Sequence, residues 1–466
     1  MKKNLTHCLT VGAIFFLFVT GMPTAIYCQS YDLVHQFDSD TTLTIQTQLQ
    51  YSGSVIVDSA GSEENQRVLP LDVNANLKFD QRISSSSTKK PQAIRYFDVA
   101  AAEIKAGKGV TETKLADQNR LVIARMAQEQ NENHVFEAAS LEDRLSQKEY
   151  ELLKTPGDSL AYPDLFNKSE VKVGDRWQPS KDLIADLVSI NRVISSDVSM
   201  MLKSVEDGLA KIYLYGDLKG ESDDIITNMS IKGIAMLNIE EKMLTSLKMT
   251  IDEERRAGQF APGFEGKIKL DSRISRTGSN PKLSKQELAK IYKGKKVKFD
   301  FLLEPTDSPF RLIHSKNWRV IASQSQAAVL RYIVDGQLIA QCNVVELPRR
   351  PADNPLKLED FRTEIGKITA NSQGAEIADY KEIVTASGLQ ALRIAVDGFE
   401  QEIPFSWLYY HISTNDGRRV TFVFTLEKDA EDYFSSADRM LVNNFSFKTD
   451  RSARSNALPK KAANVR

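Results

Sequence analysis

The residues that could carry out chemistry are few and widely separated along this 466-residue chain. Beyond residue 30 the histidines are His35, His134, His314 and His411, and no two of them have a spacing that places two metal ligands on one helix or strand. Cys342 is the only cysteine beyond that point, which excludes an intrachain disulfide and a thiolate metal cluster there. We expect Cys342 and His411 to be buried or partly buried strand residues rather than catalytic groups.

The acidic residues form short local clusters and no recognisable acid–base pair. These clusters are Asp38 with Asp40, Asp223 with Asp224, Glu240 with Glu241, and Asp252 to Glu254. Adjacent strand residues point to opposite faces, so we expect such neighbours not to share a site. The sequence also lacks a Gly-rich phosphate loop, a Gly-x-Ser-x-Gly elbow and a His-Glu-x-x-His pair. We therefore predict no catalytic, cofactor-binding or metal-binding residue and no enzyme activity, with a hydrolase of dispersed residues as the weakest alternative.

The first 30 residues have the layout of a secretory signal peptide. Lys2 and Lys3 precede an apolar run from Leu9 to Met22, which is shorter than the roughly 20 residues of a membrane-spanning helix. We expect a secreted or periplasmic protein. Cleavage after Ser30, lipidation at Cys28 and retention of the segment as an anchor stay open, and the last two give the only membrane contact that the sequence predicts.

The composition is that of a soluble globular protein without a general attraction for nucleic acid. Hydrophobic residues make up 41% and charged residues 26% of the chain, and the formal net charge is −1. Binding to nucleic acid normally requires a concentrated basic face, so we exclude that class of partner. The end of the chain from Arg451 onward is basic and has few large apolar side chains, so we expect residues 449–466 to be a disordered tail.

Residues 31–277 are expected to form a β-rich domain. Apolar and polar residues alternate in five segments, at 43–51, 71–79, 233–239, 243–251 and 264–274. This period of two places one face of a strand on a core and the other in water, as antiparallel sheets allow. We predict one large, curved, half-barrel-like antiparallel sheet with a few helices.

Capping patterns predict two helices within this domain. Ser146 and Glu149 form a capping box ahead of a helix that Pro156-Gly157 ends, and Ser180 caps a second helix with an apolar stripe. Trp177 and Trp407 are expected to be core or domain-interface anchors, because tryptophan buries a large apolar area. Asp175 is expected to fix the turn at Gly174.

The second half of the chain is predicted to be an α+β domain at 297–448, after a linker with a short helix at 278–296. Asp-Gly pairs at 335–336, 397–398 and 416–417 each separate two strand-like segments, as tight hairpin turns do. An apolar stripe predicts a helix at 358–372, and a second helix is expected around 433–441. A sheet covered by helices gives the α+β fold class for the whole chain.

The order of these elements resembles the PsbP-like (Mog-type) superfamily. The segments that carry the resemblance are 317–320, 339–342, 358–372, 388–396, 403–410, 416–418, 422–425 and 444–447. The resemblance implies an α/β/α sandwich used for binding rather than catalysis. No calcium or manganese ligand set of that superfamily transfers to this chain, so no cofactor is implied.

The first domain resembles uncharacterised bacterial secreted β-rich proteins through its Val-Gly-Asp-x-Trp element at 173–177, and its strands are similar in pattern to LolA-type lipoprotein carriers. Fold likeness alone does not establish function. We expect an exported, non-enzymatic binding protein of the cell envelope, with a protein partner or an apolar small molecule. A carrier of lipid or another apolar ligand in the half-barrel is the alternative. The sequence leaves the ligand, the partner and the oligomeric state open.

Overall fold

The computed structural model describes residues 29–36, 41–58, 66–84, 92–116, 120–128, 134–222, 225–258, 262–292, 297–352, 354–370 and 372–448. Residues 1–28 of the predicted signal peptide and the basic tail lie outside these ranges, as do Asp38, Asp40, Asp223 and Asp224. Within the described ranges, no helix is both long enough and apolar enough to cross a membrane.

The fold is mostly β. Strands hold 61% of the described residues and helices 15%, so the expected α+β class, with an α/β/α sandwich in the second half, is wrong. The share of strand is higher than predicted because the strands are long. They continue far beyond the segments in which apolar and polar residues alternate. Strand β2 has 17 residues and β3 has 19, whereas the longest described helix, α5, has 12.

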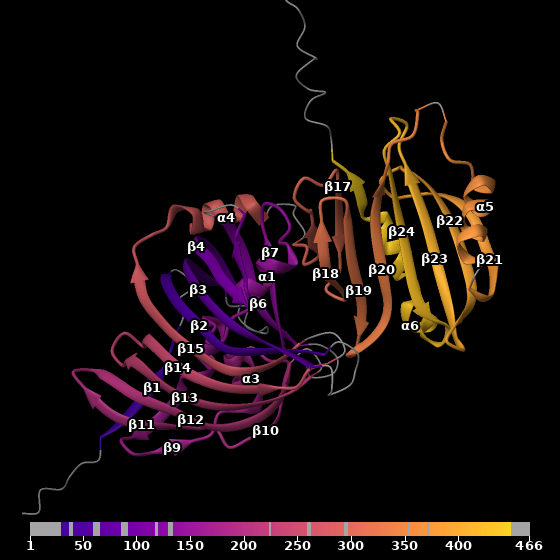
Figure 1. Cartoon of the computed structure of the whole chain (residues 1–466). Coiled ribbons are helices and arrows are strands. Elements are labelled where there is room, and N and C mark those ends of the chain that lie inside the picture. The colour runs from indigo at the N-terminus through magenta and orange to yellow at the C-terminus, as the bar shows by residue number, and fades with distance from the viewer. Residues whose placement is uncertain are drawn as a thin grey trace, which may run out of the picture.

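A 13-stranded antiparallel sheet dominates the first half of the chain (Figure 1). Its strand order is β7-β6-β4-β3-β2-β15-β14-β13-β12-β11-β9, with β5 paired to β4 and β10 paired to β12. The strand bounds are β2 (Thr42–Asp58), β3 (Gln66–Ser84), β4 (Gln92–Ala106), β5 (Gly109–Lys114), β6 (Arg120–Gln128), β7 (His134–Ser140), β9 (Arg176–Trp177), β10 (Arg192–Ser196), β11 (Ser199–Glu206), β12 (Leu209–Ser222), β13 (Ile225–Asn238), β14 (Met243–Arg255) and β15 (Gly263–Thr277).

Short helices and a small sheet cover part of the inner face of this large sheet. They are α1 (Gln147–Leu153), η2 (Ser159–Ala161), α2 (Tyr162–Leu165), α3 (Lys181–Val188) and the pair β1 (Ser30–Val34) and β8 (Asn167–Lys172). Their apolar side chains join those of the sheet in one core. The capping box at Ser146 and Glu149 and the cap at Ser180 are both present, which confirms these two predictions.

Residues 281–292 pack on the sheet rather than standing free of it. They form η3 (Pro281–Leu283) and α4 (Lys285–Tyr292), and Leu283 and Leu288 are buried beside Ile94 of β4 and Ile123 of β6. These apolar contacts cover the β4–β6 end of the outer face.

The rest of the chain forms a seven-stranded and a three-stranded antiparallel sheet, in orange to yellow in Figure 1. The seven strands, in spatial order, are β18 (Trp318–Gln324), β19 (Ala327–Val334), β20 (Gln337–Leu347), β24 (Arg419–Glu427), β23 (Ile403–Ser413), β22 (Gln390–Glu400) and β21 (Gln373–Val384). The three are β16 (Phe301–Leu303), β17 (Phe310–His314) and β25 (Phe445–Phe447). Helix α5 (Leu358–Thr369) packs on one face of the larger sheet, and η4 (Lys428–Ala430), α6 (Glu431–Phe434) and α7 (Ala437–Asn443) follow β24.

Two of the three predicted Asp-Gly turns are confirmed. Asp335-Gly336 joins β19 to β20 with positive φ at both residues, and Asp416-Gly417 joins β23 to β24. The third prediction is wrong, because Asp397-Gly398 lies inside β22 and the chain turns at Gln401 and Glu402, which have φ of 50° and 69°. Gly398 is needed for another reason: a Cβ there would lie 3.1 Å from the Trp407 side chain and from the Ala375 backbone.

Candidate functional site: an apolar pocket on the inner face of the large sheet

The four histidines and Cys342 do not come together. His35 lies in the first core and accepts a hydrogen bond from the Leu244 N–H at 2.8 Å, and burial lowers its pKa to about 4. His134 lies 2.8 Å from Asp186 of α3. His314 is on β17, and His411 packs against Phe361 of α5. Each is buried within a different part of the packing, so none supplies a shared chemical site.

Cys342 is fully buried in the second core, as expected of a small strand residue. Burial raises the pKa of its thiol well above the usual value, which disfavours the reactive thiolate. No group of three or more metal-ligating side chains occurs in the described ranges. Asp175 accepts a hydrogen bond from the Lys172 N–H beside the Gly174 turn, and Trp177 packs at the edge of the first core.

The two carboxylate clusters that can be located have different environments. Glu240 and Glu241 are exposed in the turn between β13 and β14, not on a strand. The cluster at Asp252 to Glu254 divides across the sheet, as alternation requires: Asp252 and Glu254 lie on the outer face, whereas Glu253 is only 8% exposed on the inner face.

Glu253 lies at the edge of an inner-face pocket with a volume of about 590 Å³. The pocket floor is the sheet itself, and the C-terminal ends of α1 and α3 with residues 154–156 form one wall. We call this cavity the inner pocket. It is lined mainly by Leu49, Tyr51, Leu71, Val73, Ala75, Ala102, Ile104, Leu152, Pro156, Val188, Ile190, Met229, Phe264 and Ile268.

The inner pocket exists because the covering helices are too short to reach across the whole sheet. Helix α1 lies near β4 and β5 and ends at Leu153, α3 ends at Val188, and the sheet between these two helix ends stays partly uncovered. Leu71 and Val73 are therefore only partly buried, although they continue the inward apolar rows of the core. Partly exposed apolar side chains at the bottom of a cavity are typical of a ligand site.

One polar group in the inner pocket has an unused hydrogen-bond donor. Arg255 Nε lies 3.8 Å from Glu253 Oε1 but makes no hydrogen bond to any described residue, although this atom is buried. Glu253 Oε1 accepts from the Thr227 hydroxyl at 3.0 Å. Burial raises the pKa of Glu253, and Arg255 and Thr227 oppose that effect. A ligand oxygen placed here would satisfy the Arg255 N–H.

A buried ion pair holds the wall of the inner pocket against the sheet. Arg95 of β4 donates to both carboxylate oxygens of Asp158, at 2.8 and 2.6 Å, and the two side chains are 2% and 5% exposed. Asp158 also caps η2 by accepting from the Leu160 N–H. Gly157 approaches the sheet so closely that a Cβ would lie 2.2 Å from Leu270 Cδ2. These contacts fix residues 154–158 and, with them, the shape of the pocket.

Comparison with known proteins gives only a partial likeness. No protein-family profile matches the chain, and no curated protein sequence matches it. Cyanobacterial PsbP (CyanoP) from Synechocystis is 15% identical, covering 33% of this chain and 96% of that chain with a TM-score of 0.26. A Pseudomonas aeruginosa protein of unknown function, described as a putative regulator, is 10% identical over 32% of this chain and 98% of that chain, with a TM-score of 0.23. A third of the chain thus partially resembles PsbP-like proteins, and a likeness this weak carries no argument about function.

The inner pocket was not predicted, but the sequence contains one signal for it. The inward positions of β14 run Leu247, Met249, Ile251 and then Glu253 and Arg255. A charged pair that continues an apolar row marks the place where a core gives way to a polar site. Grouping Asp252 to Glu254 as one acidic cluster obscured this change.

Proposed function

We propose that the protein is a non-enzymatic binding protein that holds an apolar or amphiphilic small molecule in the inner pocket. The observation that carries this proposal is the cavity itself, whose floor combines buried apolar side chains with the partly buried Tyr51, Leu71 and Val73 on the sheet's inner face. Filling it with an apolar molecule would remove these side chains from water, which is the main driving force for such binding.

The polar edge of the pocket narrows the class of ligand. Arg255 and Glu253 carry opposite charges close together, so this edge of the pocket does not call for a charged ligand group. An uncharged acceptor, such as an ester or hydroxyl oxygen, would take the free Arg255 N–H without leaving Glu253 facing a second negative charge. A molecule with an acyl chain and a neutral oxygen-bearing head, such as a monoacylglycerol, fits both features.

Export to the cell envelope is part of the same proposal. It rests on the basic start and apolar run of residues 1–30, and an envelope binding protein would meet lipids and other amphiphiles there. The second half of the chain could then dock a protein partner, which would couple ligand binding to a second protein.

A fluorescence titration tests the proposal. The apolar probe N-phenyl-1-naphthylamine should brighten on binding the full chain and be displaced by a monoacylglycerol. Val73→Asp places a carboxylate on the pocket floor and should weaken probe binding at least roughly tenfold, because an unpaired charge among apolar groups is costly.

Val110→Asp is the matched control. Val110 lies on β5 and is 62% exposed, while its neighbour Thr111 lines the inner pocket. This variant makes the same chemical change nearby but outside the pocket, so it should bind the probe like the unaltered protein. No probe binding by the unaltered protein, or equal weakening in both variants, would contradict the proposal.

A further inference from the structure

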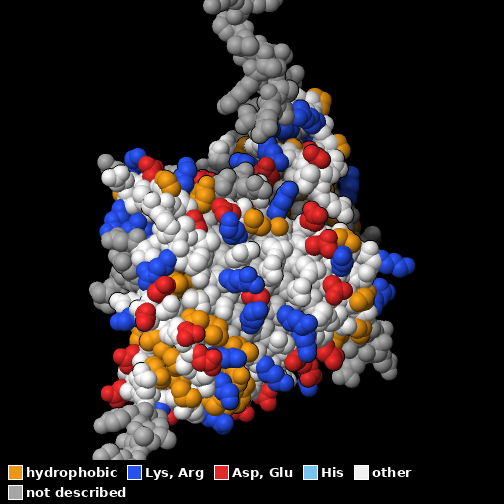
Figure 2. Space-filling view, turned by 90° about the vertical axis from the view of Figure 1, so that its left-hand side faces the viewer, with side chains coloured by type: hydrophobic (Ala, Val, Ile, Leu, Met, Phe, Trp, Pro, Cys, Tyr) orange, Lys and Arg blue, Asp and Glu red, His pale blue; other side chains and the backbone are white. Residues whose placement is uncertain are grey.

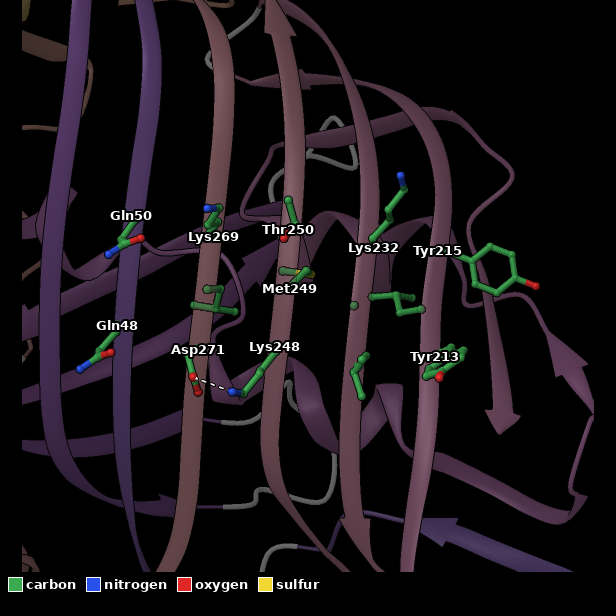
Figure 3. A pocket seen from close by; sticks show the side chains of 14 residues that line it. Gln48, Gln50, Tyr213, Tyr215, Lys232, Lys248, Met249, Thr250, Lys269 and Asp271 are labelled. Carbon is green, nitrogen blue, oxygen red and sulfur yellow. Dashed lines mark ion pairs between the residues drawn. The ribbon is translucent and has the colours of Figure 1, made fainter. Parts of the chain in front are cut away.

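The outer face of the large sheet carries a second, shallow hollow of about 630 Å³ that spans β2, β15, β14, β13 and β12 (Figure 3). Its side chains form two rows that cross the strands in register. The first row is Gln50, Lys269, Thr250, Lys232 and Tyr215, and the second is Gln48, Asp271, Lys248, Ile234 and Tyr213. We call this surface the outer hollow. It lies on the opposite face of the sheet from the inner pocket and is independent of it.

Two lysines of the outer hollow have no ion-pair partner. Lys248 pairs with Asp271 at 3.1 Å, and Lys267, one row away, pairs with Asp252 at 2.9 Å. Lys232 and Lys269 are exposed, and no acidic side chain in the described part of the chain pairs with either. They lie in one row two strands apart, which sets their backbones roughly 10 Å from each other. The hollow therefore offers two separated positive charges in a line.

The other side chains of the outer hollow are suited to a flat, hydroxyl-rich ligand. Gln48, Gln50 and Thr250 supply both hydrogen-bond donors and acceptors. Tyr213 and Tyr215 lie at one end of the outer hollow, as Figure 3 shows. Both side chains are partly exposed and present aromatic surface together with hydroxyl groups. Figure 2 shows the face that lies on the left in Figure 1, where broad white areas of backbone and of side chains that are neither hydrophobic nor charged carry scattered basic and acidic side chains. Among these hollow-lining positions Ile234 is the one large aliphatic exposed residue, so an apolar protein interface has little to bind.

We propose that the outer hollow binds an acidic polysaccharide, with Lys232 and Lys269 pairing with carboxylates on sugars along the chain. Tyr213 and Tyr215 would stack against the C–H faces of sugar rings, and the glutamine amides would exchange hydrogen bonds with hydroxyl groups. An extended polysaccharide that carries a carboxylate at regular intervals matches a row of cations two strands apart. The charge complementarity, rather than the shape alone, selects the acidic class.

Affinity electrophoresis of the full chain in gels containing polygalacturonate tests this inference. Polygalacturonate should retard the protein, and the neutral polymer dextran should not. The double variant Lys232→Gln/Lys269→Gln should weaken binding roughly tenfold, because it removes two exposed ion pairs. Tyr215→Ala should weaken it as well, without any change in net charge.

The double variant Lys78→Gln/Lys267→Gln is the matched control. It changes the net charge by the same amount on the same outer face, but both lysines already pair with acidic residues, Asp98 and Asp252. Its retardation should stay within about twofold of the unaltered protein. Absence of retardation by polygalacturonate, equal retardation by dextran, equal weakening in both double variants, or equally strong binding of duplex DNA would each overturn the proposed site.

Discussion

Replacing Arg95 by leucine should destabilise the protein strongly and open the inner pocket. The substitution leaves the Asp158 carboxylate buried without its cation, while the Leu160 N–H remains as one hydrogen-bond donor. Breaking a buried pair from one side typically costs about 3–5 kcal/mol. Arg95 also lies over the Phe79 ring, 4.8 Å from its centroid, and this contact is lost too. We expect Arg95→Leu to lower the free energy of unfolding by an amount near the upper end of that range.

The free energy of unfolding from urea denaturation, followed by far-UV circular dichroism, measures the effect. Arg95→Leu combined with Asp158→Asn removes the uncompensated charge and keeps a side-chain cap for η2, so it should recover roughly half of the loss. Lys78→Ala is the control, because Lys78 of β3 pairs with Asp98 of β4, the strand that also carries Arg95, and these two side chains are 46% and 39% exposed. This exposed pair should contribute far less to the free energy of unfolding than the buried pair does, because solvent screens its charges.

The reasoning would be refuted if Arg95→Leu cost no more than Lys78→Ala, or if adding Asp158→Asn brought no recovery. Binding of N-phenyl-1-naphthylamine provides a second measurement. Asp158 lies two residues after the pocket wall at 154–156, so losing its partner should displace that wall. Arg95→Leu should therefore weaken probe binding even at urea concentrations where the protein stays folded.

Three further predictions follow from local geometry. Ser146→Ala removes the cap of α1 and should lower the free energy of unfolding by about 1 kcal/mol in urea denaturation, whereas no loss would contradict the role of the capping box. Burial, followed by the Arg419 and Arg350 charges, lowers the pKa of His411 to about 4. The unfolded chain therefore binds this proton first, and stability that is complete above pH 6.5 falls by roughly 3 kcal/mol as the pH drops to 4. His411→Gln should remove that part of the pH dependence and leave the similar contribution of His35, whereas an unchanged pH profile would contradict it. Glu402 has a φ of 69° in the turn between β22 and β23, a conformation that glycine adopts without strain. Glu402→Gly should therefore raise the melting temperature and increase the free energy of unfolding by about 0.5–1 kcal/mol. A lower melting temperature would show that the Glu402 side chain stabilises the turn.

The local features were the part of the fold that the sequence predicted well. The capping box at Ser146 and Glu149 and the cap at Ser180 depend on residues within one helical turn, and both occur as expected. The five alternating segments lie on β2, β3, β13, β14 and β15, because a half-buried strand needs a period of two, whereas the long strands β4 and β12 were not predicted.

Features that depend on distant residues were not predictable. Arg95 and Asp158 are 63 positions apart, and nothing in either neighbourhood announces their pairing. The Asp397-Gly398 pair has the composition of a turn, but pairing of β22 with both β21 and β23 extends the strand through it. The predicted fold class was wrong for a related reason. Pairing between neighbouring strands extends them beyond the alternating segments, so strands hold a larger share of the residues and helices a smaller one.

The inner pocket shows the same limit of sequence-based reasoning. Its floor and edge come from β2, β3, β4, β5, β13, β14 and β15, and its wall from the ends of α1 and α3. The sheet is built from strands that precede and strands that follow these helices in the sequence. No local pattern therefore predicts how far a helix reaches across it. Only the charged pair at Glu253 and Arg255, placed in an otherwise apolar row, was visible beforehand.

Native mass spectrometry of the full chain purified from its own host shows directly whether the inner pocket holds a ligand. If the inner pocket binds an amphiphile, the protein should carry a mass excess that collisional activation releases as an apolar molecule, and Val73→Asp should lose that excess while Val110→Asp keeps it. If the unaltered protein shows only the mass of its own chain and releases no molecule, binding of an amphiphile in the inner pocket is contradicted.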